Sequence, residues 1–374
     1  MQQFIPVYWA TILSGLLLSC TAGQRSATSS PVPQPGDRSA TTASKEPTAD
    51  NNWPVERYLD YSGTETLLSG GSRSIAISTP KGTFKVWTKR IGNNPDMKVL
   101  ILHGGPGGSH EMYEAFDSYL PRAGIEYYYY DQLGSFNSDK PEEASLWTVE
   151  RFVDEVEQVR RALGLSKSNF YLYGHSWGGI LAIEYALQYQ QHLKGLIISN
   201  MMASAPRYNQ YVDNVLAKKM RPEVVAEIRQ IENEQQFDNP RYIELLLEHY
   251  YSKHFLRIPF EKWPDPVSRS FSRMNQEVYV LMQGPSEFGL SKSALLADWD
   301  RTEELSQIRV PTLVIGAEHD TMDPKHMAWM AKELRRGRYL YCPDGSHMAM
   351  YDDQRRYFDG LIKFIREVDS GALQ

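Results

Sequence analysis

The segment at 170–188 constrains the fold of this chain more than any other. Four apolar or aromatic residues at 170–173 run directly into Gly-His-Ser-Trp-Gly-Gly at 174–179, and a helical pattern follows over 180–188. This is a G-x-S-x-G pattern between a strand and a helix, where glycines let the two elements approach closely around a sharp, strained turn. Such a turn pushes the hydroxyl of Ser176 out above the sheet, so the pattern predicts a serine nucleophile there.

Short apolar runs alternate with helical patterns over residues 53–374. We expect an antiparallel hairpin at 73–78 and 82–89, and further strands at 99–102, 127–130, 170–173, 196–199, 312–315 and 339–342. This alternation predicts the α/β class, with a mostly parallel sheet covered by helices on both faces. Ligands of such sheets bind beyond the carboxyl ends of the strands, so the chemistry is expected in the loops that follow them.

The strand signal disappears between residues 203 and 295. Helical patterns take its place, at 222–235 and 240–254. We therefore predict an inserted helical lid at 203–295, between the two parts of an α/β core at 53–202 and 296–374. Aromatic residues of the lid, such as Tyr250 and Tyr251, are expected to pack rather than to line a substrate pocket.

A glycine-rich loop follows the strand expected at 99–102. Its sequence is His-Gly-Gly-Pro-Gly-Gly at 103–108, so its backbone N–H groups are almost uncovered by side chains. Acyl transfer needs two such donors aimed at the oxyanion of the tetrahedral intermediate, and Gly105 together with Trp177 would supply them. The alternative is a phosphate-binding loop, but the glycine patterns of those loops are missing.

A serine nucleophile needs a base, and the base must be oriented by a carboxylate. After the strand at 312–315 the chain offers Glu318, Asp320 and Asp323. Asp323 precedes a proline and fits a helix N-cap, which favours Asp320 as the acid. Of nine histidines, His347 follows the acid in a loop beyond the last strand. The order Ser176, Asp320, His347 predicts a catalytic triad.

Composition excludes several classes of function. The formal net charge is −6, which does not suggest the basic surface that nucleic acid requires. The chain has two cysteines, Cys20 and Cys342, so a disulfide framework and a multi-cysteine metal site are excluded. Cys342 is expected to be a buried small side chain. We expect no metal and no cofactor, and the sequence leaves the oligomeric state open.

The N-terminal segment is typical of exported proteins. Residues 1–20 carry no charge, and the apolar stretch at 4–18 has the length of a signal-peptide core. It ends in Leu-Leu-Ser-Cys at 17–20, which resembles a bacterial lipobox with Cys20 as the lipidated residue. A plain secretory signal or an uncleaved anchor is the alternative. Residues 21–52 have the composition of a disordered tether. We expect a lipid-anchored protein of the bacterial cell envelope, periplasmic or on the outer surface.

Five motifs together resemble the α/β-hydrolase superfamily and, within it, the proline iminopeptidases and the tricorn-associated aminopeptidases. They are His-Gly-Gly-Pro-Gly at 103–107, Asp-Gln-Leu-Gly-Ser at 131–135, Gly-His-Ser-Trp-Gly-Gly at 174–179, Gly-Pro-Ser-Glu-Phe at 284–288 and Gly-Ser-His at 345–347. The resemblance covers about 80–368. It implies a serine aminopeptidase that releases N-terminal proline or another small or apolar residue from short peptides. It also implies that Glu287 binds the substrate amine. Thr321 stands where such enzymes usually carry a second amine-binding glutamate, and Leu133 where they usually carry arginine.

Two other functions remain open from the sequence. The first is an esterase or amidase that uses the same triad on small acyl substrates. The second is a tethered binding protein that has kept the fold without catalysis. An intact Ser176, Asp320 and His347 in the right order argue against the second.

Overall fold

The computed structural model describes residues 54–62 and 64–373. The predicted signal peptide, the lipobox with Cys20 and the tether at 21–52 lie outside the described residues. No helix in the described part of the chain is long and apolar enough to cross a membrane.

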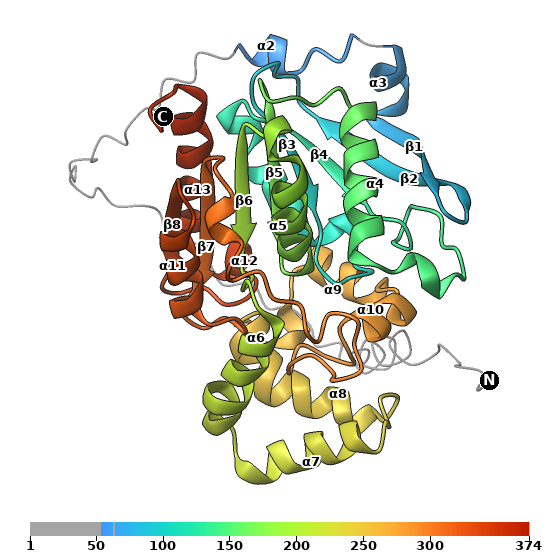
Figure 1. The fold of residues 1–374 in the computed structure, drawn as a ribbon, viewed down its shortest axis with the longest axis vertical. Coiled ribbons are helices and arrows are strands. Elements are labelled where there is room, and N and C mark those ends of the chain that lie inside the picture. Colours follow the sequence, from blue (N-terminus) through green and yellow to red (C-terminus); the bar gives the residue numbers. More distant parts are fainter. Residues whose placement is uncertain (1–53, 63, 374) are drawn as a thin grey trace, which may run out of the picture. The chain divides into compact units, whose positions relative to one another are not determined.

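One sheet of eight strands organises the described residues (Figure 1). The strands are β1 (Ser72–Thr79), β2 (Gly82–Ile91), β3 (Lys98–Leu102), β4 (Glu126–Asp131), β5 (Phe170–His175), β6 (Gly195–Ser199), β7 (Thr312–Ala317) and β8 (Gly337–Cys342), in the order β1-β2-β4-β3-β5-β6-β7-β8. The pairs β1–β2 and β2–β4 are antiparallel, and every other pair is parallel. The predicted hairpin and mostly parallel sheet are therefore confirmed.

Helices cover both faces of this sheet. The described residues form the helices α2 (Val55–Tyr58), α3 (Thr64–Ser69), α4 (Val149–Ala162), α5 (Trp177–Tyr189), α6 (Ala205–Tyr211), α7 (Pro222–Asn233), α8 (Pro240–Leu246), α9 (Asp265–Ser272), α10 (Gln276–Met282), α11 (Pro324–Glu333), α12 (Ala349–Asp352) and α13 (Gln354–Asp369). Side chains of β5 alternate between the faces. Gly174 faces α5, whereas Tyr171 and Tyr173 hydrogen-bond to residues of α13. Since both faces are covered, every residue of β4, β5, β6 and β7 is buried.

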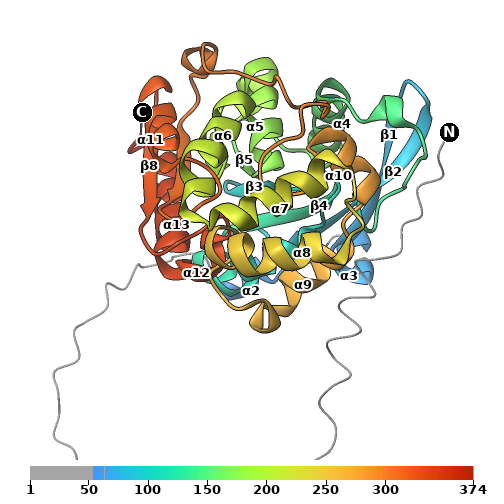
Figure 2. The same cartoon turned by 90° about the horizontal axis from the view of Figure 1, so that it is seen from below.

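The chain between β6 and β7 is helical. It contains α6 to α10, and a π-helical segment at Leu247–Phe255 continues α8. The predicted helices at 222–235 and 240–254 are thus present. In Figure 1 these helices lie beyond the carboxyl ends of the parallel strands, and Figure 2 shows them across that end of the sheet. The insertion also contacts the loop after β3, where the N–H of Asn275 donates to the carbonyl of Gly107 (2.9 Å).

Glycines allow β5, α5 and β3 to meet at one point. A Cβ atom on Gly174 would lie 1.9 Å from the carbonyl oxygen of Gly178, and one on Gly178 would lie 2.2 Å from that of Leu102. Both clashes involve backbone atoms, which cannot turn aside as a side chain can. The turn between β5 and α5 therefore requires glycine at these two positions.

Replacing Gly174 by alanine should destabilise the protein by about 3 kcal/mol, because β5 and α5 would have to separate. Urea unfolding followed by circular dichroism measures this change. Gly360→Ala in α13 is the matched control, since the nearest atoms to its added Cβ belong to the side chain of Leu340, which can move, rather than to the backbone. We expect the control to change stability by about 1 kcal/mol or less, because alanine also favours the helix. Equal losses in the two variants would contradict the role given to the turn.

Candidate active site

Ser176 occupies the turn between β5 and α5 in a strained backbone conformation. Its φ of 55° and ψ of −126° lie in a region that side chains rarely adopt. Its N–H donates to the carbonyl of Ser199 in β6 (3.1 Å), which holds the turn to the sheet. The hydroxyl does not cap α5, although Ser176 precedes the helix directly. The side chain thus projects from the carboxyl end of β5.

Asp320 and His347 form a buried pair in the loops after β7 and β8. His347 Nδ1 lies 2.8 Å from Asp320 Oδ1, and both side chains are almost completely buried. The other oxygen of Asp320 accepts a hydrogen bond from Asn200 Nδ2 (2.7 Å). This amide and the backbone N–H of Met322 (3.1 Å to Oδ1) fix the carboxylate toward the imidazole.

The two other carboxylates of the loop after β7 have different partners. Asp323 accepts a hydrogen bond from the N–H of Lys325 and caps α11, as its sequence context suggests. Glu318 accepts from the hydroxyl of Tyr341 (2.6 Å). Of the three candidates, the structure brings Asp320 to the histidine.

The environment of His347 favours its charged form. Burial is the largest influence and by itself lowers the pKa of the imidazole. The negative charge of Asp320 and its hydrogen bond to the ring act in the opposite direction and prevail, so the pKa lies above its ordinary value. The charge of Glu287 in the inserted helices raises it further. The site thus stabilises the protonated form of His347, as a general base requires.

The inserted helices hold the loop that carries His347. The N–H of His347 donates to the carbonyl of His254 (2.9 Å), and the N–H of Met348 donates to that of Phe255 (2.9 Å). The carbonyl of His347 lies 2.9 Å from Nε2 of His175, the residue before the serine. The loop of His347 is therefore held by backbone carbonyls of the lid and by the side chain of His175.

Gly105 and Trp177 present free backbone N–H groups near the serine. Neither N–H donates a hydrogen bond to another residue that the structure describes. Gly105 has a φ of 115°, and a Cβ there would lie 2.6 Å from the nitrogen of Gly108. A Cβ on Gly104 would lie 3.2 Å from that of Ser176, which places the loop beside the nucleophile. The Trp177 indole donates to Gln132 Oε1 (2.9 Å), fixing the start of α5.

Glu287 lies in a cradle of tyrosines within the lid. Its Oε1 accepts a hydrogen bond from the hydroxyl of Tyr279 (2.7 Å), its N–H donates to Tyr251 (3.1 Å), and its carbonyl accepts from Tyr208 (2.5 Å). Glu287 is 6% exposed, yet its Oε2 is buried without a hydrogen-bond partner among the described residues. Burial, followed by the charge of Glu287, raises the pKa of Tyr279, so this phenol remains a donor. Oε1 of Glu287 is thus held by a hydrogen bond, whereas Oε2 has no hydrogen-bond partner among the described residues.

Thr321 turns toward the catalytic pair rather than standing in for a carboxylate. Its Oγ1 lies 3.3 Å from Asp320 Oδ1 and 3.1 Å from His347 Nδ1. The residues that sequence reasoning missed are Asn200, Tyr208 and Tyr279, which hold Asp320 and Glu287. One of them had a signal in the sequence, because Asn200 follows a buried strand, where functional side chains of such sheets lie. Its φ of 50°, which asparagine tolerates better than most residues, is a finding of the structure.

Metal and thiol chemistry have no support within the described residues. No group of three or more histidine, cysteine, aspartate or glutamate side chains there could hold a metal ion. Cys342 is a buried free cysteine, as predicted, and burial raises the pKa of its thiol.

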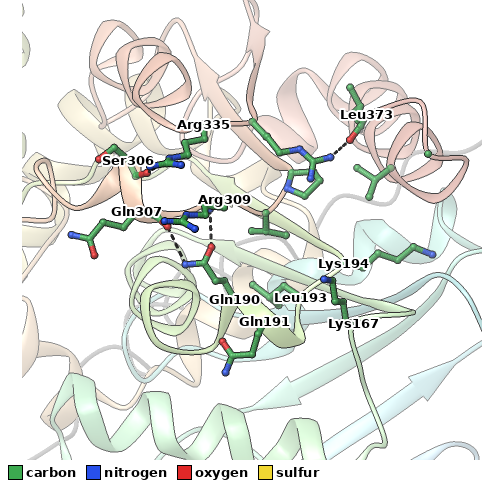
Figure 3. A pocket seen from close by; sticks show the side chains of 15 residues that line it. Lys167, Gln190, Gln191, Leu193, Lys194, Ser306, Gln307, Arg309, Arg335 and Leu373 are labelled. Carbon is green, nitrogen blue, oxygen red and sulfur yellow. Dashed lines mark hydrogen bonds between the residues drawn. The ribbon is translucent and has the colours of Figure 1, made fainter.

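A cavity lined by basic side chains lies at the amino ends of the parallel strands, at the other end of the sheet from Ser176. It has a volume of about 740 Å³ and is lined in part by Lys167, Lys194, Arg309, Arg335 and Arg336 (Figure 3). These residues precede β5, β6, β7 and β8, at the amino ends of the strands. The cavity is therefore separate from the site formed by the carboxyl-end loops.

Comparisons with known proteins agree with this arrangement. The family described as alpha/beta hydrolase fold matches residues 98–354. The chain is 57% identical to a proline iminopeptidase of Flavobacterium johnsoniae over 295 residues, which cover 79% of this chain and 98% of the relative. It is 51% identical over 298 residues to one of Chitinophaga pinensis, covering 80% of this chain and 99% of the relative.

A solved proline iminopeptidase of Mycobacterium smegmatis superposes with a TM-score of 0.70 at 27% identity, covering 80% of this chain and 99% of that one. Sequence and structure comparisons therefore point to the same group. The chain belongs to the α/β-hydrolase family and, within it, to the proline iminopeptidases.

Proposed function

We propose that the protein is a serine aminopeptidase that releases N-terminal proline from short peptides through an acyl-enzyme. The observation that carries this proposal is the open oxygen of Glu287. A buried carboxylate oxygen without a partner is costly, and a substrate ammonium group would satisfy it. The resemblance to proline iminopeptidases at 51% to 57% identity supports the same substrate.

Acylation begins at Ser176. His347 takes the proton of the serine hydroxyl as the oxygen attacks the first peptide carbonyl. Asp320, held by Asn200 and Met322, orients the imidazole and stabilises the imidazolium that forms. The N–H groups of Gly105 and Trp177 donate to the oxyanion of the tetrahedral intermediate.

Collapse of the intermediate completes the exchange. His347 passes its proton to the leaving amine, and the shortened peptide departs while the prolyl group stays bonded to Ser176. Water then attacks the ester, again with His347 as base, and proline is released. The stabilised imidazolium of His347 suits the first transfer, because it keeps the serine proton until it donates that proton to the leaving amine.

Glu287 selects the end of the chain. Its Oε2 faces the substrate ammonium, and its charge favours the imidazolium of His347 from the same side of the site. A carboxylate in this place fixes the distance from the free amine to the scissile bond, so cleavage occurs after the first residue. Helices lie across the carboxyl ends of the strands, where they would restrict access by folded proteins. This arrangement favours short peptides as substrates.

The envelope location is a proposal from the sequence. The apolar stretch at 4–18, Cys20 and the tether composition at 21–52 support a lipid-anchored peptidase at a bacterial membrane surface.

Glu287→Gln tests the proposed substrate. The change keeps the shape of the side chain but removes the charge, so kcat/KM for proline 4-nitroanilide should fall roughly ten- to a hundredfold, from the loss of about 1.5 to 3 kcal/mol. Hydrolysis of 4-nitrophenyl cyclopentanecarboxylate, which has the ring without the amine, should stay within about twofold. Glu277→Gln, an exposed position in α10, is the matched control and should leave both activities unchanged.

The wild-type enzyme should also discriminate against N-acetylproline 4-nitroanilide. If it cleaves the acetylated and free substrates equally well, the amine is not recognised. The protein would then be an esterase or amidase that uses the same triad.

The pH profile tests the pair of Asp320 and His347. The pKa of His347 is raised, and acylation needs the neutral imidazole, so kcat/KM for the amine-free ester should fall as the pH drops through a midpoint above about 6.5. Asp320→Asn removes the charge that raises this pKa. The midpoint should move to lower pH, and the rate should fall by roughly three to four orders of magnitude.

Asp323→Asn is the control for that measurement. It removes a charge from the same loop, and asparagine caps a helix as well as aspartate does, so neither midpoint nor rate should change. An unchanged midpoint in Asp320→Asn would show that this carboxylate does not set the pKa of the base.

Cys20→Ser tests the anchor. The variant should leave the membrane fraction of the cell, because the acyl chains that hold the protein would be missing. Fractionation and immunoblotting measure the distribution. A soluble form that begins near Asn51 should keep the wild-type kcat/KM. A Cys20→Ser variant that is still bound and unprocessed would show that the N-terminal segment is an uncleaved anchor.

A further inference from the structure

Two buried polar atoms of the lid lack a hydrogen-bond partner among the described residues. One is Oε2 of Glu287, and the other is the hydroxyl oxygen of Tyr250. Tyr250 is completely buried, so water does not satisfy this hydroxyl from the surface. Buried hydroxyl groups nearly always find a partner, and an exception needs an explanation. A ligand that is absent from the structure provides one.

The position of Tyr250 connects the two halves of the active site. Its ring packs edge-on against Phe288, the residue after Glu287, with centroids 4.9 Å apart. On its other side it lies 5.4 Å from the ring of His254, whose carbonyl holds the backbone of His347. The charges of Glu287 and Asp320 both act on its hydroxyl, although burial is the largest cause of its raised pKa. The phenol is therefore a neutral group whose ring packs beside the neighbour of Glu287 and beside the residue that holds the loop of His347.

The substrate brings more donors than Glu287 can accept. The ammonium nitrogen of an N-terminal proline is a secondary amine with two N–H groups, and Glu287 offers a single free oxygen. Thr321 does not supply the second acceptor, because its hydroxyl faces Asp320 and His347. Glu287 and Tyr250 are both buried, so beside them the remaining N–H needs an acceptor from the protein.

We propose that the hydroxyl of Tyr250 is the second acceptor for the substrate ammonium and that, with Glu287 Oε2, it selects secondary over primary amines. Two acceptors match the two N–H groups of proline. A primary ammonium has a third N–H, which this pair leaves without a partner. The proposal rests on the aminopeptidase function given above and names the residue that sets its preference for an imino acid.

Tyr250→Phe tests the proposal, because it removes one oxygen and keeps the ring that packs against Phe288 and His254. We expect kcat/KM for proline 4-nitroanilide to fall about tenfold or more, while hydrolysis of 4-nitrophenyl cyclopentanecarboxylate stays within about twofold. The second substrate carries a ring of the same size without an N–H group. An equal fall for both substrates would mean that the hydroxyl supports the fold of the lid, and would overturn the proposal.

Substrate pairs test the selectivity directly. The wild type should cleave N-methylalanine 4-nitroanilide, a secondary amine, more efficiently than alanine 4-nitroanilide, and Tyr250→Phe should reduce this ratio. A wild type that prefers the primary amine would refute the assignment of two acceptors.

Tyr185→Phe is the matched control variant. Tyr185 is also fully buried, but its hydroxyl donates to Glu157 on α4, outside the lid (2.9 Å). Turnover of every substrate by this variant should stay within about twofold of the wild type. If the wild type does not cleave proline 4-nitroanilide, the aminopeptidase function itself fails. If the wild type does cleave it and Tyr250→Phe does so equally well, the function stands and the role of Tyr250 is wrong.

Discussion

The close approach of β5, α5 and β3 is the constraint on which the rest of this site depends. Gly174 and Gly178 allow backbone atoms to meet where any side chain would clash, and Ser176 takes the strained conformation between them. The strain places the serine hydroxyl and the N–H of Trp177 at one end of the sheet. The packing of Gly178 against Leu102 sets the glycine loop beside them. The close packing of β5, α5 and β3 thus sets the positions of both the proposed nucleophile and the proposed oxyanion donors.

Charge is the second organising element, because the site buries two carboxylates near one histidine. Asp320 is neutralised in part by its hydrogen bonds from Asn200 and Met322 and by its pair with His347. Glu287 has hydrogen bonds at one oxygen and at its backbone, but no counter-charge among its hydrogen-bond partners. Buried charges without partners are unfavourable, so the proposed binding of a substrate ammonium group would stabilise Glu287. The negative charge of Glu287 therefore serves both the proposed binding of the substrate amine and the stabilisation of the His347 imidazolium.

The lid contacts the candidate active site through its backbone as well as its side chains. The carbonyls of His254 and Phe255 accept hydrogen bonds from the loop of His347, while the ring of Tyr250 packs against His254 and against Phe288, the residue after Glu287. A shift of the π-helical segment at Leu247–Phe255 would move the base and the amine site together. This coupling explains why a lid suits an exopeptidase, in which the free amine and the scissile bond lie one residue apart.

The sequence by itself determined the order of strands and helices, the turn at Ser176 and the choice of Asp320 and His347, because each depends on residues close together in the chain. Glycines at 174 and 178, a proline after Asp323 and a loop after each buried strand are local signals. Glu287 had no such signal, and resemblance alone singled it out. Its tyrosine cradle, the contact of Asn200 with Asp320 and the turning of Thr321 toward His347 were decided by tertiary structure. These contacts join residues from separate loops and helices. The sequence does not distinguish a buried tyrosine or asparagine that packs from one that positions a carboxylate or binds a substrate.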